Sequence, residues 1–392
     1  MTPPVTNEQI ARTLVLPYLN HAVRMFETSY ATSADIDAAM RFGCGYPSGP
    51  LAMLDELGPE TVRDQLAARY AETGDNLHRP ADLLEKVVDE GRRFAEVADS
   101  AEAPTPELKH DIATVGVVGT GTMASGIVEV FAKAGYDVVY VGRSQDKVDG
   151  VRATIEKSLD KAIARGKLDE ETRGAVLGRL TGSTSREDLA GVDLVVEAIA
   201  EDLALKTELF ADLDRICRQG AILATTTSSL PIARCAAATG RPESVIGMHF
   251  FNPAPVMKLV EVVTTELTAG DVDETVRALC ARVGKVAVSC ADRAGFIVNA
   301  LLFPYLNDAV TLLESGAADL DTVDAAIKEQ AGFPMGPFEL LDVVGNDVSL
   351  AIQKELYAEF KEPGFKPAPL LEQLVAEGHL GRKTGKGFHD YS

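Results

Sequence analysis

The sequence predicts an α/β protein in which a central domain of alternating strands and helices is flanked by two homologous all-helical domains. Two observations predict this architecture. Six short apolar runs, several of them separated by amphipathic segments, follow one another in the middle of the chain. The segments before and after this region carry apolar residues at helical spacing, and they repeat one another.

The domain boundaries follow from composition. The run Asp99–Pro106 contains two prolines and small polar residues, which are typical of a linker. We therefore expect a helical domain over residues 1–98, a linker over 99–109, a strand-and-helix domain over 110–292 and a second helical domain over 293–392.

The apolar runs of the central domain predict buried strands. Strands that alternate with helices imply right-handed crossovers and a largely parallel sheet. The expected strands are residues 114–118, 137–141, 193–197, 221–225, 245–249 and 285–289, and the clearest amphipathic helices are residues 14–30, 81–98 and 203–217.

The two terminal regions share an internal repeat. Leu14–Val23 matches Leu301–Val310 at an offset of 287 residues, and the same offset aligns Gly45–Pro50 with Gly332–Pro337. A register that holds without gaps over some forty residues indicates a duplicated helical domain, with one copy on each side of the central domain.

Composition excludes several classes of function. The chain has 392 residues, is 46% hydrophobic and carries a formal net charge of −21, so it lacks the clustered Lys and Arg that a nucleic-acid-binding surface needs. No run approaches the roughly 18 apolar residues of a membrane span, and no leader segment is expected. Five cysteines without a CxxC pair favour reduced thiols in a cytoplasmic protein, and no metal site is expected.

A glycine-rich loop follows the first expected strand. The sequence Gly119-Thr-Gly121-Thr122-Met123-Ala124 would let the chain turn tightly at the first glycine and approach a pyrophosphate at the second, where a helix begins. Because a strand precedes the loop and a second strand follows the helix, this pattern predicts a Rossmann-type dinucleotide-binding domain. The first three positions of that helix, Thr122, Met123 and Ala124, belong to the expected cofactor site.

The end of the second expected strand bears on the choice of cofactor. A site for NAD usually presents Asp or Glu there to accept from the ribose 2′-hydroxyl, whereas this chain has Val141-Gly142-Arg143-Ser144. Arg143 can pair with a 2′-phosphate and Ser144 can donate to it, so we expect NADP(H) to be favoured over NAD(H). A solvated arginine in a loop is the alternative reading.

The region from about residue 112 to 391 resembles the L-3-hydroxyacyl-CoA dehydrogenases. The segment Gly247-Met-His249-Phe-Phe-Asn252-Pro-Ala-Pro-Val-Met-Lys-Leu-Val-Glu261 carries most of the resemblance. The other motifs, in family order, are Asp193–Ile199, Thr227–Leu230, Gly295–Asn299, Gly332–Leu340 and Gly385–Phe388.

The resemblance implies a catalytic constellation. A neutral imidazole suits removal of a hydroxyl proton while a hydride leaves carbon, so His249 would be the base, and the acid in the reductive direction. Glu261 would hold the imidazole tautomer. Ser228 and Asn299 match positions near the reacting group of the substrate, and Asn252 is expected to support His249, through water.

The resemblance also assigns residues outside this centre. Ser158 and Arg165, seven residues apart on one helix, fall where the family contacts the CoA nucleotide, although a solvated helix face is an alternative. Glu197 and Lys206 match positions on the cofactor side, and both could instead be structural.

The N-terminal copy departs from the family pattern. At the 287-residue offset, Asn299 falls on Arg12, so this copy lacks the active-site amide. It also has no dinucleotide-binding partner of its own. Single-copy members of the family pair through their helical domains, so we interpret the extra copy as a built-in partner. We expect a pseudo-dimeric monomer, with a homodimer as the alternative.

The function expected from these observations is interconversion of 3-hydroxyacyl-CoA and 3-oxoacyl-CoA, for example of 3-hydroxybutyryl-CoA and acetoacetyl-CoA. A cofactor site of the NADP type would favour reduction. Two alternatives stay open: a dehydrogenase of a non-CoA hydroxy acid on the same scaffold, and a nucleotide-binding scaffold protein that has lost catalysis.

Overall fold

The computed structural model describes residues 5–97 and 105–391. These residues form two compact units, one from the central segment 103–293 and the other from the segments on either side of it. The two helical copies thus belong to a single unit. Of the linker expected over residues 99–109, residues 99–104 lie outside the described part of the chain.

The central unit is built on one eight-stranded sheet with the order β3-β2-β1-β4-β5-β6-β7-β8. Its neighbouring strands run parallel except for β6 and β7, so the prediction of a largely parallel sheet is confirmed. The strands are β1 (Thr114–Val118), β2 (Asp137–Val141), β3 (Leu180–Ser183), β4 (Leu194–Glu197), β5 (Ile222–Thr225), β6 (Val245–Phe250), β7 (Leu259–Thr264) and β8 (Val286–Ala291).

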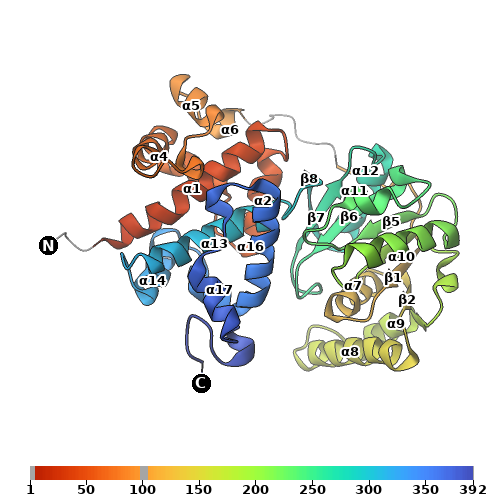
Figure 1. Ribbon diagram of the computed structural model, residues 1–392. Helices are drawn as coiled ribbons and strands as arrows, with labels where there is room; N and C mark the ends of the chain where they lie inside the picture. Colours follow the sequence, from red (N-terminus) through yellow and green to blue (C-terminus); the bar gives the residue numbers. More distant parts are fainter. Residues whose placement is uncertain (1–4, 98–104, 392) are drawn as a thin grey trace. The chain divides into compact units, whose positions relative to one another are not determined.

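Helices cover both faces of this sheet (Figure 1). One face shares a continuous apolar core with α7, α8, α9 and α12, to which β6 contributes Ile246 and Met248. The alternate residue of β6, Gly247, faces the other side, where a Cβ would lie 2.4 Å from Ile232 of α11. The helices of this unit are α7 (Thr122–Lys133), α8 (Gln145–Ala164), α9 (Glu170–Gly178), α10 (Leu203–Ile216), α11 (Ile232–Ala236) and α12 (Gly270–Arg282), with short 3₁₀ turns η2 (Arg186–Leu189) and η3 (Pro242–Ser244).

The helical unit contains the two copies of the repeat. The N-terminal copy comprises α1 (Asn7–Glu27), α2 (Ser33–Cys44), α3 (Pro50–Leu57), α4 (Pro59–Thr73), η1 (Asn76–His78), α5 (Asp82–Asp89) and α6 (Phe94–Val97). The C-terminal copy comprises α13 (Val298–Glu314), α14 (Leu320–Gln330), α15 (Pro337–Val344), α16 (Asn346–Phe360), η4 (Pro363–Phe365), α17 (Pro369–Ala376) and η5 (Arg382–Thr384). No helix in the described ranges is long and apolar enough to cross a membrane.

The structure confirms the duplication and extends its register. The helix pairs α3 and α15, α4 and α16, and α5 and α17 begin and end at positions 287 residues apart. Buried contacts repeat as well. Asn20 donates to the carbonyl of Arg79 at 2.8 Å and accepts from the N–H of Ala81 at 2.8 Å, while Asn307 makes the corresponding contacts with Lys366 and Ala368 at 2.9 and 2.8 Å.

The two copies face each other through related surfaces. Helix α1 contacts α13 and α14, and α13 contacts α2. The rings of Tyr46 and Phe333, which occupy equivalent positions, are stacked with centroids 3.6 Å apart, and those of Tyr18 and Tyr305 are 6.1 Å apart. Figure 1 shows α1 and α13 side by side in this unit. The aromatic contacts mark the axis that relates the copies.

Two helix predictions need correction. The segment 81–98 is not one helix, because α5 ends at Asp89 and Gly91 adopts a φ of +64° before α6 begins. The helix expected over 14–30 begins earlier, at Asn7, where Thr6 caps it, and ends at Glu27.

Candidate active site

A histidine–carboxylate pair lies on the β6–β7 hairpin of the central unit. His249 and Glu261 are cross-strand partners, and Nδ1 of the imidazole is 2.7 Å from Oε2 of the carboxylate. His249 is 7% exposed and Glu261 is fully buried. A carboxylate can only accept, so the neutral imidazole donates from Nδ1 and carries its lone pair on Nε2. The structure therefore brings together the two residues that we expected to share acid–base work.

Strand geometry places this pair. Ile246, Met248, Val260 and Val262 point into the core shared with α7 and α12, so the alternate residues His249 and Glu261 point to the opposite face. His249 is also the penultimate residue of β6, at the carboxyl edge of the parallel strands. Ligands of open α/β sheets bind at that edge.

The loop after β6 is fixed by a buried lysine. Lys285 donates to the carbonyl oxygens of Ala254 and Met257 at 2.5 and 2.7 Å, and burial lowers the pKa of its ammonium. Asn252 lies exposed at the start of this loop, and the Asn252–Pro253 peptide bond is cis.

Ser228 lies on the loop after β5, where a glutamate that we had not predicted holds it. Glu201 accepts from the backbone N–H of Ser228 at 2.9 Å and from the hydroxyl of Thr227 at 2.5 Å, while Lys206 lies 3.3 Å away. Burial works against the charged form of Glu201, but Lys206 and these hydrogen bonds outweigh it and hold the pKa of the carboxyl below its usual value. Glu201 thus fixes the backbone from which the Ser228 hydroxyl projects.

Glu197 and Lys206 form a buried ion pair beneath this loop. The ammonium lies 2.7 and 2.8 Å from the two carboxylate oxygens, and the side chains are 0% and 1% exposed. The hydroxyl of Thr225 and the N–H of Ile199 complete the coordination of the carboxylate at 2.6 and 2.7 Å. Both residues were expected on the cofactor side, but neither lines the cavity described next.

A cavity of about 900 Å³ opens beside the loop between β1 and α7. Of the residues expected at a cofactor, those on its wall are Gly119, Gly121, Thr122, Met123, Arg143 and Ser144, whereas Ala124 is fully buried beneath the loop.

The loop fits a dinucleotide phosphate. Gly119 has a φ of +139°, and a Cβ there would lie 2.3 Å from the carbonyl oxygen of Ala198. A Cβ on Gly121 would meet nothing within 4 Å, so the backbone is open to a ligand where α7 begins. A helix N-terminus at that place favours an anionic group.

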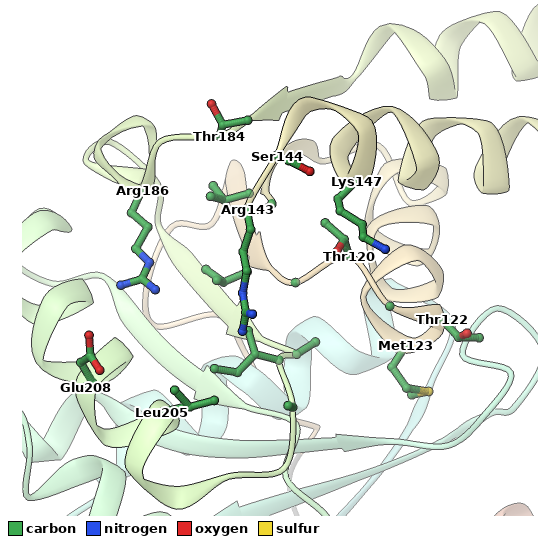
Figure 2. A pocket seen from close by; sticks show the side chains of 18 residues that line it. Thr120, Thr122, Met123, Arg143, Ser144, Lys147, Thr184, Arg186, Leu205 and Glu208 are labelled. Carbon is green, nitrogen blue, oxygen red and sulfur yellow. The ribbon is translucent and has the colours of Figure 1, made fainter.

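Three cationic side chains line the same cavity. Figure 2 shows Arg143 reaching into the pocket between Arg186 and Lys147 in that view. Arg186 also donates to Asp212 at 2.7 Å. Glu208 is the one acidic side chain among the described residues of the wall. In a chain with a net charge of −21, this wall is a local excess of positive charge.

The remaining expected residues lie elsewhere. Ser158, on α8, donates to Oε1 of the buried Glu129 at 3.0 Å, and Arg165 is exposed at the C-cap of the same helix. Asn299 lies in the first turn of α13, in the helical unit.

Sequence reasoning missed Glu201, Lys147 and Arg186. Glu201 stands in a loop, and its partners Thr227 and Ser228 come from a different loop, so no local spacing connects them. Lys147 lies in the first turn of α8, four positions after Arg143, and its positive charge so close to Arg143 in the sequence could have marked it. Arg186 follows β3, a strand that we had not predicted.

Two family models match this chain. The model described as "3-hydroxyacyl-CoA dehydrogenase, NAD binding domain" matches residues 114–293. The model described as "3-hydroxyacyl-CoA dehydrogenase, C-terminal domain" matches twice, at residues 10–97 and 295–391. The double match agrees with the duplication seen in the helical unit.

Relatives support the same assignment. A 3-hydroxybutyryl-CoA dehydrogenase of Clostridioides difficile is 44% identical over 278 residues, which cover 71% of this chain and 99% of the relative. One from Mycobacterium tuberculosis is 45% identical over 282 residues, with the same two coverages. The crystal structure of (S)-3-hydroxybutyryl-CoA dehydrogenase from Ralstonia eutropha superimposes with a TM-score of 0.71 at 41% identity, covering 72% of this chain and 100% of that one. This chain therefore belongs to the 3-hydroxyacyl-CoA dehydrogenase family of oxidoreductases.

Proposed function

We propose that this protein interconverts 3-hydroxyacyl-CoA and 3-oxoacyl-CoA, with His249 as the acid and base of the reaction. The observation that carries the proposal is the buried 2.7 Å contact between Nδ1 of His249 and Oε2 of Glu261. With Nδ1 donating to Glu261, the lone pair of the imidazole is on Nε2, which would exchange a proton with the substrate oxygen in a unit that also holds a dinucleotide-type cavity. The bound nicotinamide cofactor would supply or accept the hydride.

The other polar residues have supporting roles in this proposal. Glu261 holds the imidazole tautomer and stabilises the imidazolium that forms in the oxidative direction. The Ser228 hydroxyl binds the substrate oxygen, and Glu201 positions Ser228 through its backbone. Asn299 supplies an amide near the reacting group. Asn252 supports His249 through water. Ser158 and Arg165 contact the CoA nucleotide.

We further propose that NADP(H) is favoured over NAD(H). Arg143 and Ser144 line the cavity at the end of β2, where a carboxylate for the ribose 2′-hydroxyl would otherwise be expected, and Gly142 has no side chain to offer. A 2′-phosphate carries close to two negative charges, which the guanidinium can meet and a carboxylate would repel. Because NADPH pools are usually kept reduced, the working direction would be reduction of the 3-oxoacyl-CoA.

The compartment and the assembly state are also part of the proposal. Four of the five cysteines are buried and none of the five forms a disulfide bond, which suits the reducing cytoplasm. The two helical copies already face each other within one chain, so the protein would work as a monomer.

The first test is to compare initial rates of acetoacetyl-CoA reduction with NADPH and with NADH. We expect turnover with both, and a kcat/KM at least about tenfold higher with NADPH, since one hydrogen bond to a charged group contributes about 1.5–3 kcal/mol. A preference for NADH would contradict the cofactor assignment alone. Absence of turnover with either cofactor would exclude acetoacetyl-CoA as the substrate and move the search to longer acyl chains, carrier-protein thioesters or a non-CoA hydroxy acid.

The role of His249 is tested by His249→Ala. General acid–base catalysis contributes on the order of 10²–10⁴-fold, so kcat should fall by that factor. Binding of NADPH, followed by fluorescence titration, should stay within about twofold, because His249 is not on the wall of the cofactor cavity. Equal losses of turnover and of cofactor binding would instead indicate a folding defect.

A further inference from the structure

A second cavity lies entirely within the helical unit, on the N-terminal copy. It has a volume of about 440 Å³ and lies between α1 and α3, with Arg12 on its wall. Two residues from the other copy, Gln330 and Ala331 at the end of α14, complete it. This cavity is therefore built by both copies together.

The repeat predicts which residues form the related place on the C-terminal copy. At the 287-residue offset Arg12 corresponds to Asn299, so the related place is the face that carries the active-site amide. The same offset makes Gly43 and Cys44, at the end of α2, the counterparts of Gln330 and Ala331. If the two copies meet symmetrically, the N-terminal copy lies beside Asn299.

Contacts across the axis support this symmetry. A Cβ on Gly45 would lie 3.8 Å from Cγ of Pro334, and a Cβ on the equivalent Gly332 would lie 3.4 Å from Cγ of Pro47. Helix α13 contacts α2 and α1 contacts α14, and the contact between α1 and α14 is the more extensive of the two. The loop after α2 thus meets the C-terminal copy as the loop after α14 meets the N-terminal copy.

The two related places differ in chemistry. Five polar residues line the cavity on the N-terminal copy. Arg12 corresponds to Asn299, and each of the other four corresponds to an apolar residue or glycine at the related place. The pairs are Glu8 and Gly295, Ser48 and Met335, Glu56 and Val343, and Gln330 and Gly43. A mostly apolar wall with one amide is the composition expected of a site for an acyl chain with one polar end.

We infer that the N-terminal copy supplies part of the acyl-binding wall, with Cys44 as a residue that limits the acyl chain. The inference rests on the proposed function, since the acyl chain is that of the 3-hydroxyacyl-CoA or 3-oxoacyl-CoA substrate. The N-terminal copy, although it lacks the active-site amide, then has a role in substrate selection. Cys44 is partly exposed, whereas the other four cysteines are buried.

The test changes the size of residue 44 and measures chain-length preference. For Cys44→Phe, the ratio of kcat/KM for a 3-oxodecanoyl-CoA to that for acetoacetyl-CoA should fall about tenfold or more, because misfit of an apolar group in a pocket costs about 1–3 kcal/mol. Cys44→Ala should move the same ratio in the opposite direction. Because alanine is smaller, the Cys44→Ala variant still tests the inference if the Cys44→Phe protein does not fold.

The repeat supplies a matched control. Ala331→Phe places the same bulk at the related position on the other copy, in the 440 Å³ cavity, and should leave the ratio at its wild-type value. An unchanged ratio in both Cys44 variants, or an equal change in Ala331→Phe, would overturn the inference while the activity of the wild-type enzyme stands. Failure of the wild-type protein to turn over any 3-oxoacyl-CoA would overturn the proposed function instead.

Labelling of the thiol gives an independent readout. Burial raises the pKa values of Cys217, Cys235 and Cys280 to about 11, 12 and 12, so these thiols stay protonated and covered at pH 8. Decanoyl-CoA, which has no 3-oxygen to reduce, should slow iodoacetamide labelling of Cys44 several-fold, and free CoA should not. Equal labelling rates with and without decanoyl-CoA would contradict the placement of Cys44 beside the acyl chain.

Discussion

At the scale of single residues, the buried pair of Glu197 and Lys206 raises the question whether two positions matched to the family serve the cofactor or the stability of the unit. Its charges neutralise each other at 2.7 and 2.8 Å, and Thr225 and Ile199 saturate the carboxylate. Because neither side chain lines the cofactor cavity, the geometry favours a role in stability.

Replacing Lys206 by Met is expected to destabilise the protein by about 3–5 kcal/mol, since it leaves an uncompensated buried carboxylate. The melting temperature should fall by about 6–20 °C for a unit of this size. Thermal unfolding measured by circular dichroism or calorimetry checks this expectation.

Two further variants make the result specific. The double variant Glu197→Gln/Lys206→Met removes both charges and should recover most of the lost stability. Lys157→Met, at an exposed position of α8, should stay within about 0.5 kcal/mol of wild type. A Lys206→Met protein with normal stability but a raised KM for NADPH would show that the cofactor-side reading of this pair was correct.

The residue types in the sequence predicted the contact between His249 and Glu261 better than they predicted the hydrogen bonds around Ser228. His249 and Glu261 stand in one motif, so their chemistry could be anticipated, and the structure places them in contact. The hydrogen bond from the backbone N–H of Ser228 to Glu201 joins two loops, which follow the neighbouring strands β5 and β4. Contacts of that kind come from the sheet order, which no local spacing encodes.

At the scale of elements, the turn after β2 is the basis for a prediction about the choice between NADP(H) and NAD(H). A Cβ on Gly142 would lie 2.6 Å from Cγ2 of Thr120 and 3.0 Å from Cγ2 of Val148. The methyl group of Thr120 thus occupies the space that a carboxylate-bearing side chain at position 142 would need. The two positions should therefore act together in excluding an NAD-type carboxylate.

The double variant Gly142→Asp/Thr120→Ala is expected to lower kcat/KM for NADPH by about tenfold to a hundredfold, through repulsion of the 2′-phosphate. Its kcat/KM for NADH should exceed that of Gly142→Asp alone, because the shorter residue 120 makes room for the carboxylate. Steady-state rates with the two cofactors give both values. Thr120→Ala alone adds no charge and should keep the preference for NADPH, and a double variant that still prefers NADPH would contradict the steric argument.

The missed elements have physical reasons. Strand β3 is a four-residue edge strand with Thr181, Gly182 and Ser183, so it lacks the apolar run that identified its neighbours. Strand β7 follows a loop with two prolines, and its apolar run Leu259–Thr264 was overlooked; its pairing with β6 and β8 shows it to be a strand. The break at Gly91 was hidden because apolar residues continue at helical spacing beyond it. Periodicity thus identified six of the eight strands and the long helices, but missed the edge strand β3, the interior strand β7 and the one-turn break at Gly91.

At the scale of the whole molecule, the duplication determines the expected assembly. The relatives from C. difficile and M. tuberculosis are matched over 99% of their length by 71% of this chain, so one helical copy is additional to what they contain. In this chain the additional copy covers the C-terminal one through α1 and through the stacked rings of Tyr46 and Phe333. The surface that would otherwise be open for pairing is thereby filled from within the chain.

The full chain is therefore expected to be a monomer with a mass close to 41.8 kDa in light scattering at micromolar concentrations. Deletion of residues 1–104 should expose Tyr305, Phe333 and the apolar side of α13, and such a patch favours self-association. The shortened protein should accordingly run at twice its own mass, or associate further. A full chain at about twice 41.8 kDa, or a shortened protein that stays monomeric, would contradict the built-in partner. Adding the separate N-terminal copy to the shortened protein should replace this self-association by a one-to-one complex, because the same faces would meet again.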